Sequence, residues 1–172
     1  MLAELRAALA ALEPALGAAE GEPEVLDGGI TNRNFRVTAG GREVVVRLPG
    51  KDTELLGIDR DAERAATEAA ARLRLGPDVV AHLRKPPCLV TRFIAGRAIP
   101  ADELRTPAML DEVARSLRAL HGMPRLPSRF DAFAVIAAYH ATAVARGTPA
   151  PPGYDALAAG AREIAAALGS AS

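Results

Sequence analysis

A short segment rich in glycine and polar residues, GGITNRNF at 28–35, lies between two stretches whose composition is typical of β-strands. Gly28 and Gly29 let the backbone approach a ligand closely, because glycine carries no Cβ. Thr31 and Asn32 can donate hydrogen bonds from short side chains. Such a loop can cover a phosphate chain with its donors. The same composition is typical of an ordinary hairpin turn, so the loop alone leaves both interpretations open. It lacks the GxxxxGK[ST] pattern of a P-loop.

A cation that could meet a phosphate follows in the segment VVVRLPG. Strand alternation places Val44, Val46 and Leu48 on one face, and Arg47 on the other. Arg47 is then either an exposed charge at the end of a strand or a cation directed under the loop, toward the α- and β-phosphates of a nucleotide.

The helical pattern that comes next contains two acids in different surroundings. Glu68 has Arg64 and Arg72 four residues away on either side, so exposed ion pairs account for it. Glu63 has only alanine and threonine at the spacings considered, and it lies on or beside the apolar stripe. A carboxylate in that position needs a partner from elsewhere in the fold. We expect Glu63 to pair with Arg47 and so to fix the position of the guanidinium.

A fourth candidate is LVTRFIAG at 89–96, where a predicted strand runs directly into a glycine and the character of the chain changes. A crossing between a β-rich and an α-rich lobe exposes backbone groups at the edge of a cleft, where they can hydrogen-bond an adenine ring. The alternative is an ordinary strand end.

The elements that must position these residues can be read from the pattern. Strands are predicted near 24–26, on both sides of a glycine turn at 40–41, at 79–83 and at 88–94. A helix capped by Asp59 lies between the third and fourth strands and ends before Gly76. These elements predict a five-stranded antiparallel sheet with one helix.

Helices account for the rest of the chain. An amphipathic helix is predicted at the N-terminus, interrupted near Pro14, and further helices open at Pro107, Asp131 and Asp155. We therefore divide the chain into a mixed α and β lobe at 1–96, which includes the leading helix and the hinge, and the start of a helical lobe at 97–172.

Composition narrows the function classes. The 172 residues carry 21 basic and 21 acidic side chains, so net charge gives no reason to propose nucleic acid or a membrane as partner. The single cysteine and three scattered histidines form no metal-ligand pattern. The N-terminus does not read as a signal peptide, and no apolar run of about 18 residues occurs, so a cytoplasmic protein is expected.

Five segments in order resemble the choline/ethanolamine kinase branch of the aminoglycoside phosphotransferase superfamily, whose fold is protein-kinase-like. They are GGITNRNFRV, VVVRLPG, IDRDAERAATEAAARLRLGPDVV, LVTRFIAG and SLRALHG. The resemblance covers roughly residues 15 to 145, and GGITNRN followed by VRLPG is its most specific part. It implies an α+β fold: a kinase-like small lobe, followed by the first helices of a truncated helical large lobe.

The resemblance also implies a chemistry. ATP would donate its γ-phosphoryl group to the alcohol of a small amino-alcohol, with Mg²⁺ required. The nucleotide-binding residues implied are Gly28, Gly29, Thr31, Asn32, Arg47, Glu63, Arg92 and Ile94. Thr31, Asn32 and Arg47 would serve the phosphates, Glu63 would pair with Arg47, and the backbone of Arg92 and Ile94 would form hinge contacts.

One departure from the family limits these expectations. The catalytic loop H-x-D-x-x-x-x-N and the metal-binding D-x-E segment do not occur within residues 120–172, and His121 is followed by glycine and methionine. We therefore expect no catalytic residue and no metal ligand in this chain, which alone would be inactive. The alternatives are a truncated, non-catalytic nucleotide-binding or interaction module, or an α+β fragment that binds nothing. The acceptor stays open among choline, ethanolamine, thiamine and an aminoglycoside.

Overall fold

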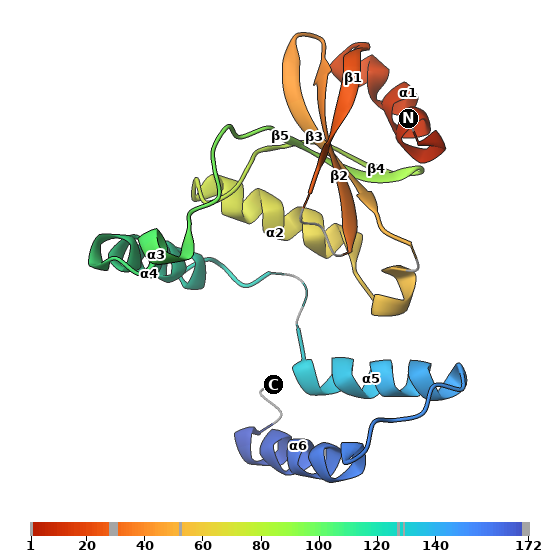
Figure 1. Ribbon diagram of the computed structural model, residues 1–172, viewed down its shortest axis with the longest axis vertical. Helices are drawn as coiled ribbons and strands as arrows, with labels where there is room; N and C mark the ends of the chain where they lie inside the picture. Colours follow the sequence, from red (N-terminus) through yellow and green to blue (C-terminus); the bar gives the residue numbers. More distant parts are fainter. Residues whose placement is uncertain (1, 28–30, 52, 127, 129, 170–172) are drawn as a thin grey trace. The chain divides into compact units, whose positions relative to one another are not determined.

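The computed structural model describes residues 2–27, 31–51, 53–126, 128 and 130–169. The chain folds as two units (Figure 1). The first contains residues 1–53 and 58–127, and the second contains residues 54–57 and 128–172. The predicted lobe boundary at residue 96 lies within the first unit, where the chain passes from strands to helices. A division into two lobes at this residue stays a prediction.

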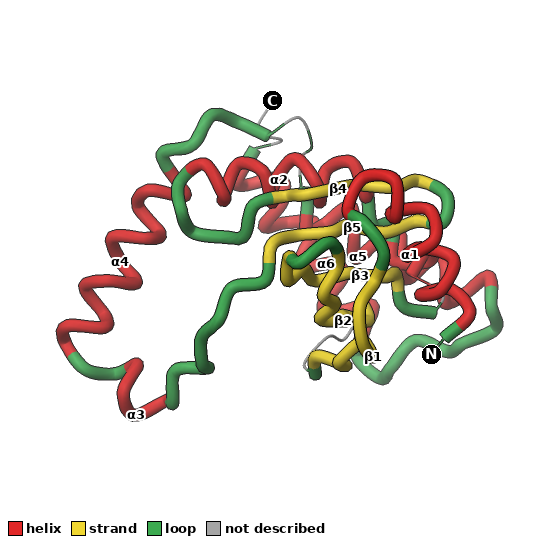
Figure 2. The backbone as a smooth tube through the Cα atoms, turned by 90° about the horizontal axis from the view of Figure 1, so that it is seen from above, coloured by secondary structure: helices red, strands yellow, loops and turns green. Residues whose placement is uncertain are grey.

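The first unit is built on a five-stranded sheet with strand order β1-β2-β3-β5-β4 (Figure 2). Every neighbouring pair of strands is antiparallel. The strands are β1 (Ala19–Leu26), β2 (Asn32–Ala39), β3 (Arg42–Pro49), β4 (Val79–Arg84) and β5 (Pro87–Arg92). The predicted sheet is confirmed, and its largest changes of boundary are in β1 and β5. β1 begins five residues earlier than the apolar pattern indicated, because the pairing Ala19↔Ala39 extends it. β5 ends at Arg92 rather than at Ile94.

Helix α1 (Ala3–Leu16) covers one face of this sheet (Figure 1). Its buried residues recur every three or four positions and pack against valines of β2, β3 and β5. The predicted interruption at Pro14 is wrong, since the helix continues to Leu16. Pro14 lies in the last turn, where it removes one hydrogen bond to the preceding turn. The burial of Leu12 and Leu16 on either side of it holds this turn against the sheet.

Helix α2 (Arg60–Arg72) lies on the other side of the sheet and contacts β4 (Figure 1). Asp59 is its N-cap, as predicted, and the carboxylate accepts hydrogen bonds from the backbone N–H groups of Asp61 and Ala62. A 3-10 turn, η1 (Thr53–Leu56), precedes the helix.

The later helices begin close to their predicted positions. They are α3 (Ala101–Leu104), α4 (Pro107–His121), α5 (Ala132–Ala145) and α6 (Tyr154–Leu168). The start of α4 and the Asp131 cap of α5 are confirmed. α6 begins one residue before Asp155, after Gly153 in a left-handed conformation. The short α3 was not predicted. No helix in the described part of the chain is long and apolar enough to cross a membrane.

Candidate nucleotide-binding site

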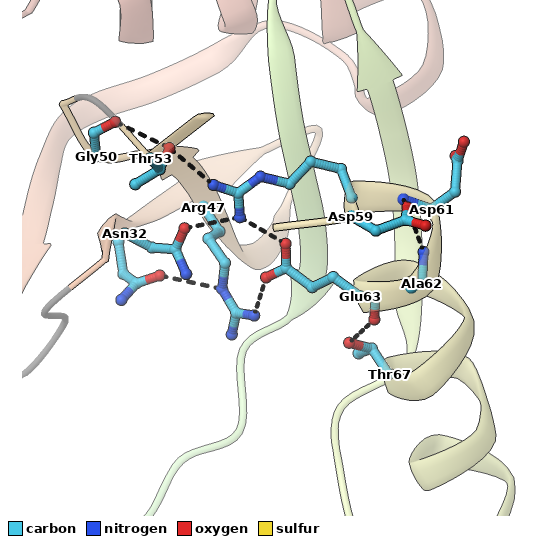
Figure 3. A network of polar contacts seen from close by, with 11 residues as sticks. Asn32, Arg47, Gly50, Thr53, Asp59, Asp61, Ala62, Glu63 and Thr67 are labelled. Carbon is cyan, nitrogen blue, oxygen red and sulfur yellow. Dashed lines mark hydrogen bonds and ion pairs between the residues drawn. The ribbon is translucent and has the colours of Figure 1, made fainter. Parts of the chain in front are cut away.

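Arg47 lies on the face of the sheet predicted from strand alternation. Its neighbours Val46 and Leu48 are buried in the core with α1, whereas the Arg47 side chain is one-third exposed on the opposite face. Burial of alternate residues along β3 therefore turns this guanidinium toward α2 (Figure 3).

The predicted ion pair between β3 and α2 is confirmed. Nη1 of Arg47 lies 2.9 Å from Oε1 of Glu63, and only 18% of the Glu63 side chain is exposed. The contrast with the neighbouring acid also holds, because Glu68 pairs with Arg64 at 2.8 Å along the helix surface. Glu63 thus joins two elements, whereas Glu68 serves only its own helix.

Glu63 also has a partner in its own helix, so the expectation that it had none is wrong. Nη1 of Arg60 lies 2.7 Å from Oε2 of Glu63, at the i,i+3 spacing. The same Arg60 nitrogen donates to Oδ1 of Asn32 at 3.0 Å, and Nη2 donates to Oγ1 of Thr53 at 3.2 Å. The i−3 position relative to Glu63 was the sequence signal that could have identified Arg60.

The two arginines determine the charge of this carboxylate. Burial raises the pKa of Glu63, but hydrogen bonds and charge from Arg60 and Arg47 outweigh it, so the pKa lies below its ordinary value. Glu63 is therefore ionised at neutral pH, and its negative charge is shared between two guanidinium groups.

The polar loop contributes to this network through alternate residues. Oδ1 of Asn32 accepts from Arg60, and Oδ1 of Asn34 accepts from Nε of Arg47 at 3.3 Å. Arg33, between them, turns away: it pairs with Glu4 of α1 at 2.8 Å. The loop's own arginine thus plays no part in the network, because strand alternation directs it to the face that α1 covers.

The backbone holds the start of β2 against the end of β3. The Thr31 carbonyl accepts a hydrogen bond of 2.8 Å from the N–H of Gly50. A Cβ at Gly50 would lie 2.7 Å from this carbonyl oxygen, so glycine is required for the close approach. Gly28 and Gly29, predicted to contact phosphate, lie outside the described residues.

The structure does not bring the predicted hinge residues into the network. Among the described residues, no hydrogen bond or ion pair connects Arg92 or Ile94 to Arg47. The N–H of Arg92 donates to the Asp78 carbonyl at 2.9 Å, and Ile94 is 59% exposed after the end of β5. If Arg92 contacts adenine through its backbone, its carbonyl oxygen is the group that can do so.

A cavity of about 220 Å³ adjoins the ion pair. Its lining comes from the ends of β3, β4 and β5 and from the first turn of α2, and includes Arg47, Glu63 and Arg84. Arg84 pairs with Asp61 at 2.8 Å, so it lies at the same cavity as the ion pair. Cys88 also lines the cavity, and burial raises the pKa of its thiol. It is therefore expected to be unreactive.

The described residues fit the phosphate part of a nucleotide better than its metal. Arg47 and the loop amides are anion-binding groups. Within the described ranges, no group of three or more His, Cys, Asp or Glu side chains could hold a metal ion. The described residues by themselves therefore do not fit a magnesium site.

Comparison with known proteins places this fold in a family. A model of the phosphotransferase enzyme family matches residues 22–170. The choline/ethanolamine kinase family protein from Mesorhizobium loti has 31% identity and a TM-score of 0.69, over 96% of this chain and 54% of that chain. Choline kinase LicA from Streptococcus pneumoniae has 20% identity and a TM-score of 0.70, over 96% and 58%.

A choline kinase from Cryptosporidium parvum has the same fold, with 17% identity and a TM-score of 0.62, over 93% of this chain and 50% of that chain. The chain thus spans about half the length of these solved relatives. Comparison with curated proteins gives no match. The predicted α+β, kinase-like fold class is confirmed, and because the family model extends over most of the sequence, this chain belongs to the phosphotransferase enzyme family.

Proposed function

We propose that this chain forms the nucleotide-binding half of a choline/ethanolamine-kinase-type phosphotransferase and binds the phosphates of ATP. The observation that carries the proposal is the Arg47–Glu63 ion pair. A guanidinium held by a carboxylate keeps a fixed direction and loses less rotational freedom when an anion binds. The pair thus preorganises a cation beside the polar loop.

The donors around Arg47 support binding of the α- and β-phosphates. The side chain of Thr31 and the amide groups of Asn32 and Asn34 lie at the start of β2, next to the end of β3. Hydrogen-bond donors in this position can neutralise phosphate charge together with Arg47. Adenine would then lie at the carboxyl end of β5, against the backbone of Arg92 and Ile94, with residues 1–96 acting as one lobe and residues 97–172 as the start of the other.

The acceptor in this proposal is the primary alcohol of a small amino-alcohol. Its support is the 31% identity with a protein described as a choline/ethanolamine kinase family member. The reaction would transfer the γ-phosphoryl group to that alcohol in the cytoplasm. The general base, the magnesium ligands and most of the acceptor pocket would come from sequence outside this chain.

A second function is favoured by one sequence observation. Neither H-x-D-x-x-x-x-N nor the D-x-E metal segment occurs within residues 120–172. A chain with the phosphate cradle but without these groups would act as a nucleotide-binding or interaction module. Phosphoryl transfer after addition of the second half of a related kinase would distinguish an enzyme half from such a module.

Titration of the chain with ATP, followed through backbone amide NMR shifts, tests nucleotide binding directly. We expect shifts at Thr31, Asn32 and Arg47, with a Kd near or above ~1 mM, because the metal-binding segment expected for the family does not occur within residues 120–172. Saturable shifts confined to other parts of the chain, or no shifts at all, would reject the proposal.

A further inference from the structure

We propose that Arg60 is the second positioning arginine of the phosphate site. It holds the Asn32 amide and shares Glu63 with Arg47, so that the cluster keeps a net positive charge that can attract the phosphate. This inference rests on the proposed function, since it assigns a role within the same site. Arg60 itself would not contact the phosphate.

The contacts of Arg60 connect three segments that are separate in the sequence. One guanidinium nitrogen bonds to both Asn32 at the start of β2 and Glu63 in α2, and the other bonds to Thr53 in the connection before α2. Oγ1 of Thr53 in turn donates to the Gly50 carbonyl at 3.2 Å. Thr53 is 5% exposed, so the hydrogen bonds at the Thr53 end of this network are shielded from water and contribute more than a surface contact. Figure 3 shows the network.

The arginines determine which end of each asparagine amide can meet an anion. A side-chain amide has one acceptor oxygen and one donor nitrogen. Arg60 uses the oxygen of Asn32, and Arg47 uses the oxygen of Asn34. The Nδ2 groups are then left as the donors available to phosphate. Without Arg60, the Asn32 amide could rotate and present its oxygen, which repels an anion.

The charge balance gives Arg60 a second effect. Arg47 binds Oε1 of Glu63 and Arg60 binds Oε2, so the two guanidinium groups do not compete for one oxygen. Two guanidinium groups and one carboxylate leave a net positive charge in the cluster. Loss of Arg60 would leave an electrically neutral pair of Arg47 and Glu63, with less attraction for phosphate.

The first test needs no nucleotide. Hydrogen exchange of the Gly50 amide, which is bonded to Thr31, reports on the link between the two segments that Arg60 stabilises. We expect Arg60→Gln to increase this exchange rate at least about threefold, because a locally looser structure opens more often. Arg64→Gln, one turn further along the same helix, is the matched control and should leave the rate unchanged. Equal rates in wild type and Arg60→Gln would overturn the proposal.

The second test separates positioning from general stability. Arg60→Gln should weaken ATP binding about fivefold, the loss expected when the geometry of charged hydrogen bonds is disturbed, and should leave adenosine binding unchanged. Arg60→Lys should recover part of the loss, since it restores the charge without the planar set of donors. Equal losses for ATP and adenosine, or none for ATP, would contradict the inference. Failure of the wild type to bind ATP would reject the proposed function, and the exchange rate of Gly50 would then decide whether Arg60 holds the loop.

Discussion

Glu63 of α2 lies 2.9 Å from Arg47 of β3, 16 positions apart in the sequence, and this contact fixes the helix relative to the strand that carries the cation. The cluster around it is completed by Arg60 and two asparagines. Each contact in this cluster uses a different oxygen atom of Glu63 or of the two asparagine amides. Replacement of one side chain at a time therefore measures the contribution of each contact separately.

Replacement of Arg47 tests the central cation. We expect Arg47→Ala to weaken ATP binding about tenfold or more, because it deletes a charged donor to phosphate. NMR titration would measure the change. Arg84→Ala is unsuitable as a control, because Arg84 lines the cavity beside the ion pair. Arg115→Ala is a better one, since Arg115 is exposed on α4 and pairs with Glu112. An equal effect of both replacements would mean that Arg47 has no specific role.

Thr31→Ala should have a smaller effect on the same equilibrium. One neutral hydrogen bond is worth about 0.5–1.5 kcal/mol, so we expect ATP affinity to fall by about two- to tenfold, and less than with Arg47→Ala. Calorimetric or NMR titration at fixed ionic strength would measure it. A loss larger than that of Arg47→Ala would show that the loop, rather than the guanidinium, dominates phosphate binding.

Gly50→Ala tests the backbone link between β3 and the loop. The added methyl group would lie 2.7 Å from the Thr31 carbonyl oxygen, so we expect a loss of about 1–3 kcal/mol in the free energy of unfolding, as for other overpacked sites. Urea denaturation measures this loss. In Gly96→Ala the new Cβ has no atom within 4 Å, so this control should be nearly neutral. Equal stability of the two variants would show that the contact can relax without cost.

Glu63→Gln should make the free energy of unfolding less dependent on pH in the acid range. The pKa of Glu63 is lowered in the folded state, so its ionised form stabilises the protein above the unfolded-state value of about 4.3, and this contribution disappears as pH falls through the folded pKa. At pH 7 we expect the variant to be less stable by about 1–3 kcal/mol, because two partly buried guanidinium groups lose their charged acceptor. The difference should shrink as the pH falls below that unfolded-state value and through the lower folded pKa.

Urea denaturation across this pH range would show the convergence. Glu112→Gln, which removes an exposed pair in α4, should change stability little at any pH. A difference between wild type and Glu63→Gln that stays constant from neutral to acid pH would contradict the assignment of Glu63 as an ionised partner of two arginines.

The isolated chain should transfer no phosphoryl group to choline or ethanolamine above background. Loss of general-base catalysis alone lowers rates by ~10²–10⁴, and the magnesium ligands expected for the family are absent from residues 120–172 as well. A coupled assay for ADP release would measure the rate. Choline-dependent turnover would show that a residue within these 172 positions acts as the base.

The sequence determined those features that depend on local periodicity. The alternation of Val44, Val46 and Leu48 predicted the face of Arg47, and the absence of a basic residue four positions from Glu63 predicted a partner on another element. Asp59 was recognisable as a cap because the cap motif lies within four residues. These predictions succeeded because strand and helix periods by themselves decide which side of an element a residue occupies.

Tertiary structure alone decided which residues distant in the sequence come into contact around Arg47 and Glu63. The sequence did not indicate that Arg60 would reach Asn32, 28 positions away, or that Arg33 would turn to Glu4 of α1. It also indicated a break at Pro14, and that expectation was wrong. The pairing register of β2 and β3 and the packing of α2 on the sheet determine these contacts. Both arise from burial summed over many residues, which no short segment contains.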